Sequence, residues 1–172
     1  MKTNQLGCLL FWVVAICNSS YAQDQNTTEY NKAIYGEIGY LPLTVRFENG
    51  AFIKPELVNL KLGVTFNENL SLEGIAATTV KENRGASVDM IGMFLKPKIS
   101  LTERTEVFAL TGLTHLRAGG TAYGSSTRGS FGAGIQTKFN ERQYLQLNYM
   151  RYATGKGREV VQGFNLSLGT SF

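Results

Sequence analysis

The sequence predicts an all-β fold, a transmembrane eight-stranded antiparallel up-and-down β-barrel. Three observations indicate it: apolar residues recur at alternate positions, short turns alternate with longer connections, and the 172 residues include 19 glycines. Alternation with a period of two is typical of strands that have one apolar face. Only helices and closed barrels satisfy their backbone groups inside lipid, and no segment after the N-terminal region has about 18 consecutive apolar residues.

The N-terminal residues have the features of a cleaved secretory signal peptide. Lys2 provides a positive charge, the apolar run Leu6 to Cys17 follows it, and Ser20 and Ala22 are small residues around a cleavage site. An uncleaved membrane anchor is the alternative. We expect three segments, namely a signal peptide at 1–22, a polar leader at 23–31 and an outer-membrane barrel domain at 32–172.

The composition argues against several kinds of site in the exported chain. Both cysteines, Cys8 and Cys17, fall within the expected signal peptide, which leaves no disulfide and no thiolate metal site. His115 is the single histidine, so we expect no histidine-rich metal site and no cofactor. The formal net charge of +4 is too diffuse to predict a nucleic-acid partner.

Eight segments are expected to form strands. Three of them are less regular than the others, and these are 33–41, 88–101 and 106–116. Because proline cannot donate to a strand ladder, we expect a bulge or a strand end at Pro97. Either face of 106–116 could be the outer one. The regular strands are 58–66, a strand that begins with 70–77, 130–139, 144–149 and 160–172.

The connections between the strands differ in length at the two ends. Short turns at one end and longer loops at the other are typical of outer-membrane barrels, whose short turns are periplasmic. An even number of strands then places both termini at the periplasmic end. The short turns are expected at 67–69, 102–105 and 140–143, and the longer connections at 42–57, 81–87, 117–129 and 154–159.

The less apolar face of the strands combines glycines with polar and charged residues of both signs. A membrane barrel directs this face inward, and eight strands leave an interior just wide enough for side chains to fill. Because unpaired charges are costly in a narrow lumen, we expect Glu37, Lys61, Glu73 and Lys138 to form a charged plug. The alternative is a water-filled lumen. The predicted polar network of the barrel interior comprises Glu37, Lys61, Glu73, Gln136, Lys138, Gln146, Asn148 and Asn165.

Aromatic residues gather near the expected strand ends. Rings of this kind prefer the headgroup level of a bilayer, so they predict a girdle at each membrane interface. Ordinary core packing of the rings is the alternative. The periplasmic girdle would contain Phe66, Phe139, Tyr144 and Phe172, and the outer girdle would contain Tyr40, Tyr149 and Tyr152.

The C-terminal segment, 163–172, combines spaced hydrophobic residues with a final aromatic residue. It resembles the strand that the bacterial barrel-assembly machinery recognises, which implies Gly163, Leu166, Leu168 and Phe172 as an assembly signal. Together with 62–74, 131–136 and 145–149, it resembles the small OmpA/OmpX-like bacterial outer-membrane β-barrel proteins (outer membrane protein beta-barrel domain). This resemblance implies a cell-envelope protein of the Gram-negative outer membrane.

The chain offers little for catalysis. His115 is the only candidate imidazole base, and it lacks the His-x-Ser pairing of the lipid A deacylase barrels. Ser125 and Ser126 follow in the next expected loop and Glu159 is a candidate orienting acid, but catalysis requires mutual contact that the sequence does not indicate. We therefore expect no catalytic residues and no enzyme.

These features predict an outer-membrane barrel with a structural or surface-interaction role and a polar-filled lumen. Its expected partners are outer-membrane lipid and lipopolysaccharide, the barrel-assembly machinery, and a surface ligand that binds loops 42–57 and 117–129. The alternatives are a narrow pore for ions or small solutes, a lipid-modifying enzyme and a soluble lipocalin-like barrel. Basic residues in or near the expected loops are Lys54, Arg84, Arg128, Lys156 and Arg158.

Overall fold

The computed structural model describes residues 33–47, 50–120, 124–154 and 160–172, so the expected signal peptide and leader lie outside the described residues. The described residues form nine strands. They are β1 (Ile34–Arg46), β2 (Phe52–Ile53), β3 (Glu56–Asn67), β4 (Leu70–Lys81), β5 (Ala86–Ser100), β6 (Thr105–Gly120), β7 (Gly124–Lys138), β8 (Gln143–Thr154) and β9 (Val160–Ser171).

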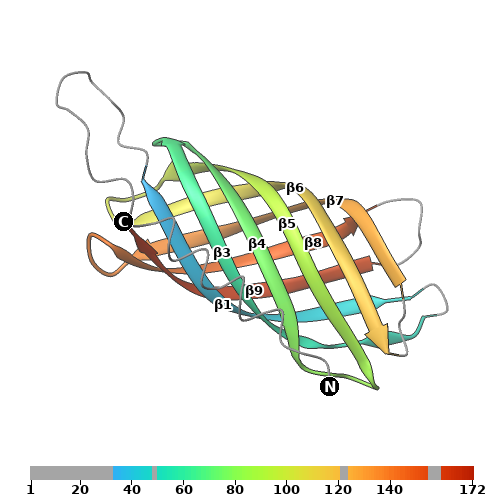
Figure 1. The fold of residues 1–172 in the computed structure, drawn as a ribbon. Coiled ribbons are helices and arrows are strands. Elements are labelled where there is room, and N and C mark those ends of the chain that lie inside the picture. The colour runs from blue at the N-terminus through green and yellow to red at the C-terminus, as the bar shows by residue number, and fades with distance from the viewer. Residues whose placement is uncertain (1–32, 48–49, 121–123, 155–159) are drawn as a thin grey trace, which may run out of the picture.

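Eight long strands close into one antiparallel barrel (Figure 1). From β3 to β9 each strand pairs with the next, β3 also pairs with β1, and β1 closes the ring by pairing with β9. The two-residue strand β2 pairs only with the end of β1, through Val45↔Ile53 and Arg46↔Phe52. The predicted eight-stranded barrel is confirmed, with β2 as an addition at one end.

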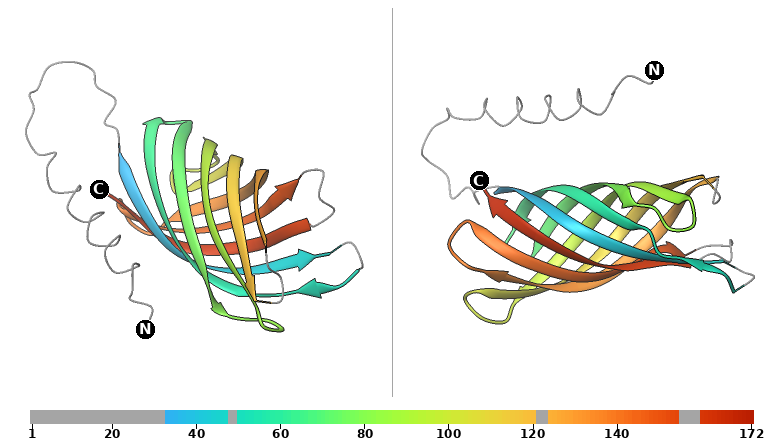
Figure 2. Two further views of the ribbon diagram at one scale, coloured as in Figure 1. Left: turned by 45° about the vertical axis from the view of Figure 1, so that its right-hand side comes forward. Right: turned by 90° about the horizontal axis from the view of Figure 1, so that it is seen from below.

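The two ends of the barrel differ in their connections. The turns 68–69, 101–104 and 139–142 define the short-turn end, which also contains the C-terminus (Figure 2). The opposite end, which we call the hairpin end, contains β2 and the turn 82–85. The short turns occur where the sequence predicts them.

The expected long loops at the hairpin end are largely replaced by strand. β6 has 16 residues and β7 has 15, and they remain paired up to Ala118↔Gly124, within the expected loop 117–129. β1 likewise continues to Arg46, past its expected end at Leu41. Because backbone groups still require partners beyond the apolar band, hairpin pairing extends there in place of irregular loop.

The outside of the barrel carries a broad apolar band. Ile38 and Leu113 are 64% and 62% exposed, and their neighbours on the same faces are similarly apolar. Bare apolar surface of this extent is typical of a lipid-facing barrel wall and not of a water-facing one. Further members of the band are Leu60, Leu62, Ile91, Met93, Leu95, Ile135, Leu147, Phe164, Leu166 and Leu168.

The aromatic residues follow the predicted girdles only in part. Phe66, Phe139 and Phe172 are exposed at the short-turn end, and Tyr40 and Tyr149 are exposed on the outside. The assignment of Tyr144 and Tyr152 to the girdles is wrong, because both side chains point into the barrel and are 3% and 1% exposed. Their positions alternate with the lipid-facing residues of β8, which places them on the inner face.

Pro97 neither ends nor bulges β5, so that prediction is wrong. The register of β5 against β6 is the same on both sides of it, Leu95↔Thr111 and Lys98↔Phe108. The Lys98 N–H donates to the Asn69 carbonyl on the β4 side at 2.8 Å. Because successive residues of an antiparallel strand bond to opposite neighbours, the Pro97 nitrogen, which carries no hydrogen, faces β6. One ladder hydrogen bond is lost, and the strand continues.

The inner and outer faces of β6 are now assigned. Phe108 and Leu110 are buried inside the barrel, whereas Ala109, Thr111 and Leu113 are exposed on its outside. Near the short-turn end of β6, the larger side chains therefore point into the lumen, whereas farther along Leu113, His115 and Arg117 point outward.

Candidate functional site: a lumen closed in two layers

The short-turn half of the lumen contains four buried charged side chains of alternating sign. Lys61 Nζ lies 2.8 Å from Glu37 Oε2 and 3.6 Å from Glu73 Oε1. Lys96 Nζ lies 3.3 Å from Glu73 Oε2 and 3.6 Å from Glu37 Oε1. We call Glu37, Lys61, Glu73 and Lys96 the charge quartet; each member has two partners of opposite sign and is at most 3% exposed.

Hydrogen bonds complete the coordination of the charge quartet. The Tyr144 hydroxyl donates to Glu37 Oε1 at 2.9 Å, and the Tyr35 hydroxyl donates to Glu73 Oε2 at 3.2 Å. Lys96 also donates to the side-chain oxygens of Gln146 and Gln136, at 2.5 and 3.3 Å. Buried charges are tolerated when they are paired and hydrogen-bonded in this way. Further buried polar side chains at this level are Asn59, Asn148, Asn165 and Ser167.

The predicted network residues, with one exception, have buried side chains in the lumen. Lys138 is the exception: its side chain is 41% exposed at the short-turn opening, where Nζ lies 3.2 Å from Glu106 Oε1. Lys98 contacts the same carboxylate at 3.3 Å. Lys96, which was not predicted, occupies the fourth position of the quartet. The buried residues are Glu37, Lys61, Glu73, Gln136, Gln146, Asn148 and Asn165.

Two glycines make room for the tyrosines that contact the charge quartet. A Cβ added at Gly63 would lie 2.1 Å from Cζ of Tyr35, and one added at Gly169 would lie 2.2 Å from Cζ of Tyr144. Each ring therefore lies against bare backbone of another strand. Glycine in a strand interior usually weakens the strand, but at these two positions only glycine leaves room for the tyrosine ring.

We expect Gly63→Val to destabilise the barrel by about 1–3 kcal/mol, since the new side chain would displace the Tyr35 ring from a packed interior. Urea unfolding in detergent micelles, followed by tyrosine fluorescence or by gel mobility, measures the change. Gly74→Val on the adjacent strand is the matched control, because an added Cβ there meets nothing nearer than 3.8 Å. Equal stability of both variants and the wild type would contradict this packing.

The hairpin half of the lumen is mostly apolar, and its buried polar side chains include Thr114 and Ser130, whose hydroxyls hydrogen-bond at 2.9 Å. Leu41 and Leu57 are fully buried, and Leu43, Met150 and Tyr152 are 1% exposed. The prediction of a polar-filled lumen is therefore wrong for this half. We call Leu41, Leu43, Leu57, Met90, Met150 and Tyr152 the apolar layer. The same buried cluster continues along β5 and β6 through Phe94, Leu110 and Phe108, and the centroid of the Phe108 ring lies 4.5 Å from Lys96 Nζ.

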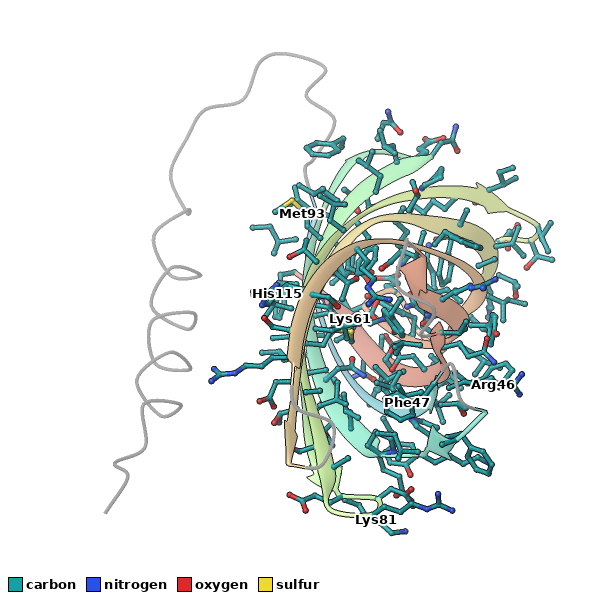
Figure 3. The ribbon with its side chains drawn as sticks, turned by 90° about the vertical axis from the view of Figure 1, so that its right-hand side faces the viewer. Arg46, Phe47, Lys61, Lys81, Met93 and His115 are labelled. Atoms are coloured by element: carbon teal, nitrogen blue, oxygen red, sulfur yellow. The ribbon has the colours of Figure 1, made fainter. Side chains whose placement is uncertain are left out.

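The two layers lie inside the ring of strands. Viewed from the hairpin end, Lys61 lies within the ring, whereas Met93 and His115 lie outside it (Figure 3). Charged pairs thus fill the lumen toward the short-turn end, and the apolar layer fills it toward the hairpin end.

The candidate catalytic residues do not assemble as a triad would require. His115 Nδ1 lies 2.8 Å from Thr127 Oγ1 on the exposed outer face. Ser126 is the register partner of the buried Leu116, so it is on the opposite face of the sheet from His115. Ser125 is the register partner of Arg117 and shares the outer face with His115, but the side chain paired with the His115 ring is that of Thr127. Glu159 lies outside the described residues. In the part of the chain that the structure describes, no group of three or more His, Cys, Asp or Glu side chains is placed to hold a metal ion.

A closed barrel of eight long strands with an apolar exterior and short turns at one end defines an outer-membrane-type β-barrel. The chain belongs to the outer membrane protein beta-barrel domain family, whose model matches residues 9–172. The protein is therefore a transmembrane barrel of the bacterial outer membrane. Because short turns are periplasmic in this class, we expect its short-turn end to face the periplasm and its hairpin end to face outward.

Solved structures share this fold at low sequence identity. Ail, the attachment invasion locus protein of Yersinia pestis, is 21% identical, with 82% of this chain and 99% of that chain covered and a TM-score of 0.60. Ail is also known in complex with the heparin analogue sucrose octasulfate. Neisserial surface protein A is 16% identical over 81% of this chain and 97% of that chain, with a TM-score of 0.62. No curated protein matched the sequence.

Proposed function

We propose that the protein is a non-conducting, non-catalytic surface-interaction barrel whose hairpin end binds sugars that carry phosphate or sulfate groups. The observation that carries this proposal is an exposed aromatic ring with two cationic side chains over it and a third cationic residue paired with it across the strands. We call this group the Phe52 patch, and it comprises Arg46, Phe52, Lys54 and Arg84.

The Phe52 patch is assembled from two neighbouring hairpins. Phe52 is 46% exposed and is the register partner of Arg46, so the two side chains share the outward face. Lys54 Nζ and Arg84 Cζ lie 5.4 and 5.8 Å from the centroid of the Phe52 ring. The Lys54 N–H donates to Asn83 Oδ1 at 3.2 Å, which joins this loop to the turn 82–85.

The chemistry of the patch fits multiply charged sugars. Guanidinium and ammonium groups form strong charge-assisted hydrogen bonds with sulfate and phosphate oxygens. The exposed phenyl ring offers an apolar face between them. The complex of Ail with sucrose octasulfate supports the same class of ligand for a barrel of this fold.

Lipopolysaccharide is the membrane-bound source of such groups. Beside the patch, Glu56 bridges the Lys81 ammonium at 2.7 Å and the Tyr40 hydroxyl at 2.6 Å on the outer surface. Tyr40 has the amphipathic ring expected at the headgroup level, so this bridge would mark the outer interface next to the phosphates. Lys81 itself lies at the margin of the hairpin end (Figure 3).

The last strand supports a second proposed partner, the barrel-assembly machinery. Leu166, Leu168 and Phe172 are 47%, 52% and 73% exposed on the lipid face of β9 and its end. Gly163 lies on the inner face against the Pro42 carbonyl. The spaced apolar residues of the proposed assembly signal thus share one outward face of the last strand.

We expect Lys54→Gln/Arg84→Gln to weaken binding of sucrose octasulfate by roughly three- to tenfold, as for the loss of partly exposed ion pairs. Binding is measured on the barrel in phospholipid nanodiscs at two salt concentrations, and it should weaken as salt rises. Arg104→Gln/Arg142→Gln, which removes the same charge at the short-turn end, should bind like the wild type.

A second arm of this experiment replaces the soluble sugar with lipopolysaccharide in the nanodisc. Retention of lipopolysaccharide by the wild type and its loss in Lys54→Gln/Arg84→Gln would assign the patch to the membrane's own sugar. If Lys54→Gln/Arg84→Gln loses sucrose octasulfate binding but still retains lipopolysaccharide, the Phe52 patch would be assigned to a soluble polymer. Binding that ignores salt, or that falls equally in the short-turn control, would contradict the proposal.

A further inference from the structure

The hairpin end of the lumen contains a cavity of about 270 Å³ that the surface function does not use. Its walls include the inward side chains Val45, Val88, Leu116 and Val161, which are 4–7% exposed. These side chains belong to the same cluster as the apolar layer, which lies beneath them. We call this cavity the outer cup.

One wall of the outer cup is polar and cationic. Ser126 and Arg128 line the cavity, and they are the register partners of the inward-facing Leu116 and Thr114. Since paired residues share a face, β7 directs both side chains into the lumen. Arg128 was expected to lie in an outer loop; it lies instead within a strand, beside an apolar cavity.

We propose that the outer cup binds a small aromatic carboxylate, with its ring among the valines and its carboxylate at Arg128 and Ser126. An apolar cavity of about 150 Å³ is sufficient for benzene, so the volume of the cup suits one substituted ring. Larger drug-like ligands occupy sites of roughly 300–1,000 Å³. The charge of Arg128 favours an anion over a neutral ring of the same shape.

The outer cup is a binding site and not a passage. Leu41, Leu43, Leu57 and Met150, which do not line the cup, fill the lumen on its short-turn side with side chains that are at most 1% exposed. Phe47 lines one side of the cup, and the Phe47 N–H donates to the Ala51 carbonyl at 2.9 Å, which holds the turn between β1 and β2. A ligand would therefore enter and leave at the hairpin end.

Methyl NMR of the barrel in nanodiscs, titrated with benzoate, tests the proposal. Saturable shifts are expected for the methyl groups of Val45, Val88, Leu116 and Val161. The lipid-facing Leu147 is expected to remain unchanged. The neutral isostere benzamide should bind the wild type roughly fivefold more weakly, which is the size of effect of a partly exposed ion pair.

Two variants separate the apolar and ionic parts of the site. Arg128→Gln should make the affinities for benzoate and benzamide equal, and Ala118→Leu should abolish binding of both by filling the cup. Ala109→Leu on the lipid face of the same strand is the control for Ala118→Leu, and gel mobility verifies that each variant is folded. Lys54→Gln/Arg84→Gln should bind benzoate normally, which distinguishes the cup from the Phe52 patch.

Linear shifts that do not saturate, or equal shifts at Leu147, would overturn the proposal in favour of partitioning into the bilayer. Equal affinity of the wild type for benzoate and benzamide would overturn the assignment of the carboxylate to Arg128. Undiminished binding of benzoate and benzamide to folded Ala118→Leu would show that the ligand does not bind in the outer cup.

Discussion

Lys61→Ala is expected to lower the free energy of unfolding by about 3–5 kcal/mol, the cost of breaking a buried ion pair by removing one partner. The loss leaves Glu37 and Glu73 with one cation between them, Lys96, inside a lumen where their side chains are at most 1% exposed. Urea titration of the purified barrel in detergent micelles, followed by the mobility shift between unheated and boiled samples, measures the effect.

Lys138→Ala is the matched control, because it removes the same type of side chain from the short-turn opening. Its side chain is 41% exposed, so its contact with Glu106 is screened by solvent and its loss should cost less than about 1 kcal/mol. Lys61→Ala/Glu37→Gln should recover part of the lost stability, since it restores the charge balance. Wild-type stability of Lys61→Ala, together with no conductance, would rule out the charge quartet as a plug.

Leu60→Arg is expected to destabilise the inserted barrel by about 2–4 kcal/mol, as arginine does on the lipid face near the bilayer midplane. Leu60 is the register partner of Ile38 and Ala76 on an outward face in the middle of the apolar band. Folding into phospholipid vesicles, monitored by gel mobility over a urea series, measures the cost.

Thr44→Arg provides the comparison on the neighbouring strand. Thr44 shares the outward face of β1 but lies beyond Tyr40 toward the hairpin end, so an arginine there should cost roughly 0–1 kcal/mol. An equal penalty at Thr44 and Leu60 would mean that the apolar band is not where the bilayer sits.

The strand faces in the middle of the barrel could be predicted from the sequence because the two faces differ there. In β3, Lys61 and Gly63 point inward while Leu60 and Leu62 point to lipid, and the alternation is visible directly. In the hairpin half both faces are apolar: Leu41 is inward and Tyr40 outward, and Leu57 is inward and Val58 outward. The period of two disappears there, so the apolar layer could not be recognised.

The identity of the fourth plug residue could not be predicted, because alternation assigns a side chain to a face but not to a height along the barrel. Heights depend on strand tilt and stagger, which only the closed barrel determines. Lys138 and Lys96 both point inward, but Lys138 lies at the short-turn opening and Lys96 lies beside Tyr35 and Phe108. The prediction that Tyr144 belongs to a girdle is wrong because position near a strand end does not distinguish an aromatic ring of a girdle from one in the lumen.

Single-channel recording in a planar lipid bilayer tests most directly whether this barrel is closed and acts through its surface. With the charge quartet on the periplasmic side and the apolar layer above it, the wild-type barrel should insert and give no resolved conductance steps. Inserted protein is verified by its gel mobility after recovery from vesicles. Stable, stepwise ion conductance by the wild type would contradict the account and make a narrow pore the function of the protein.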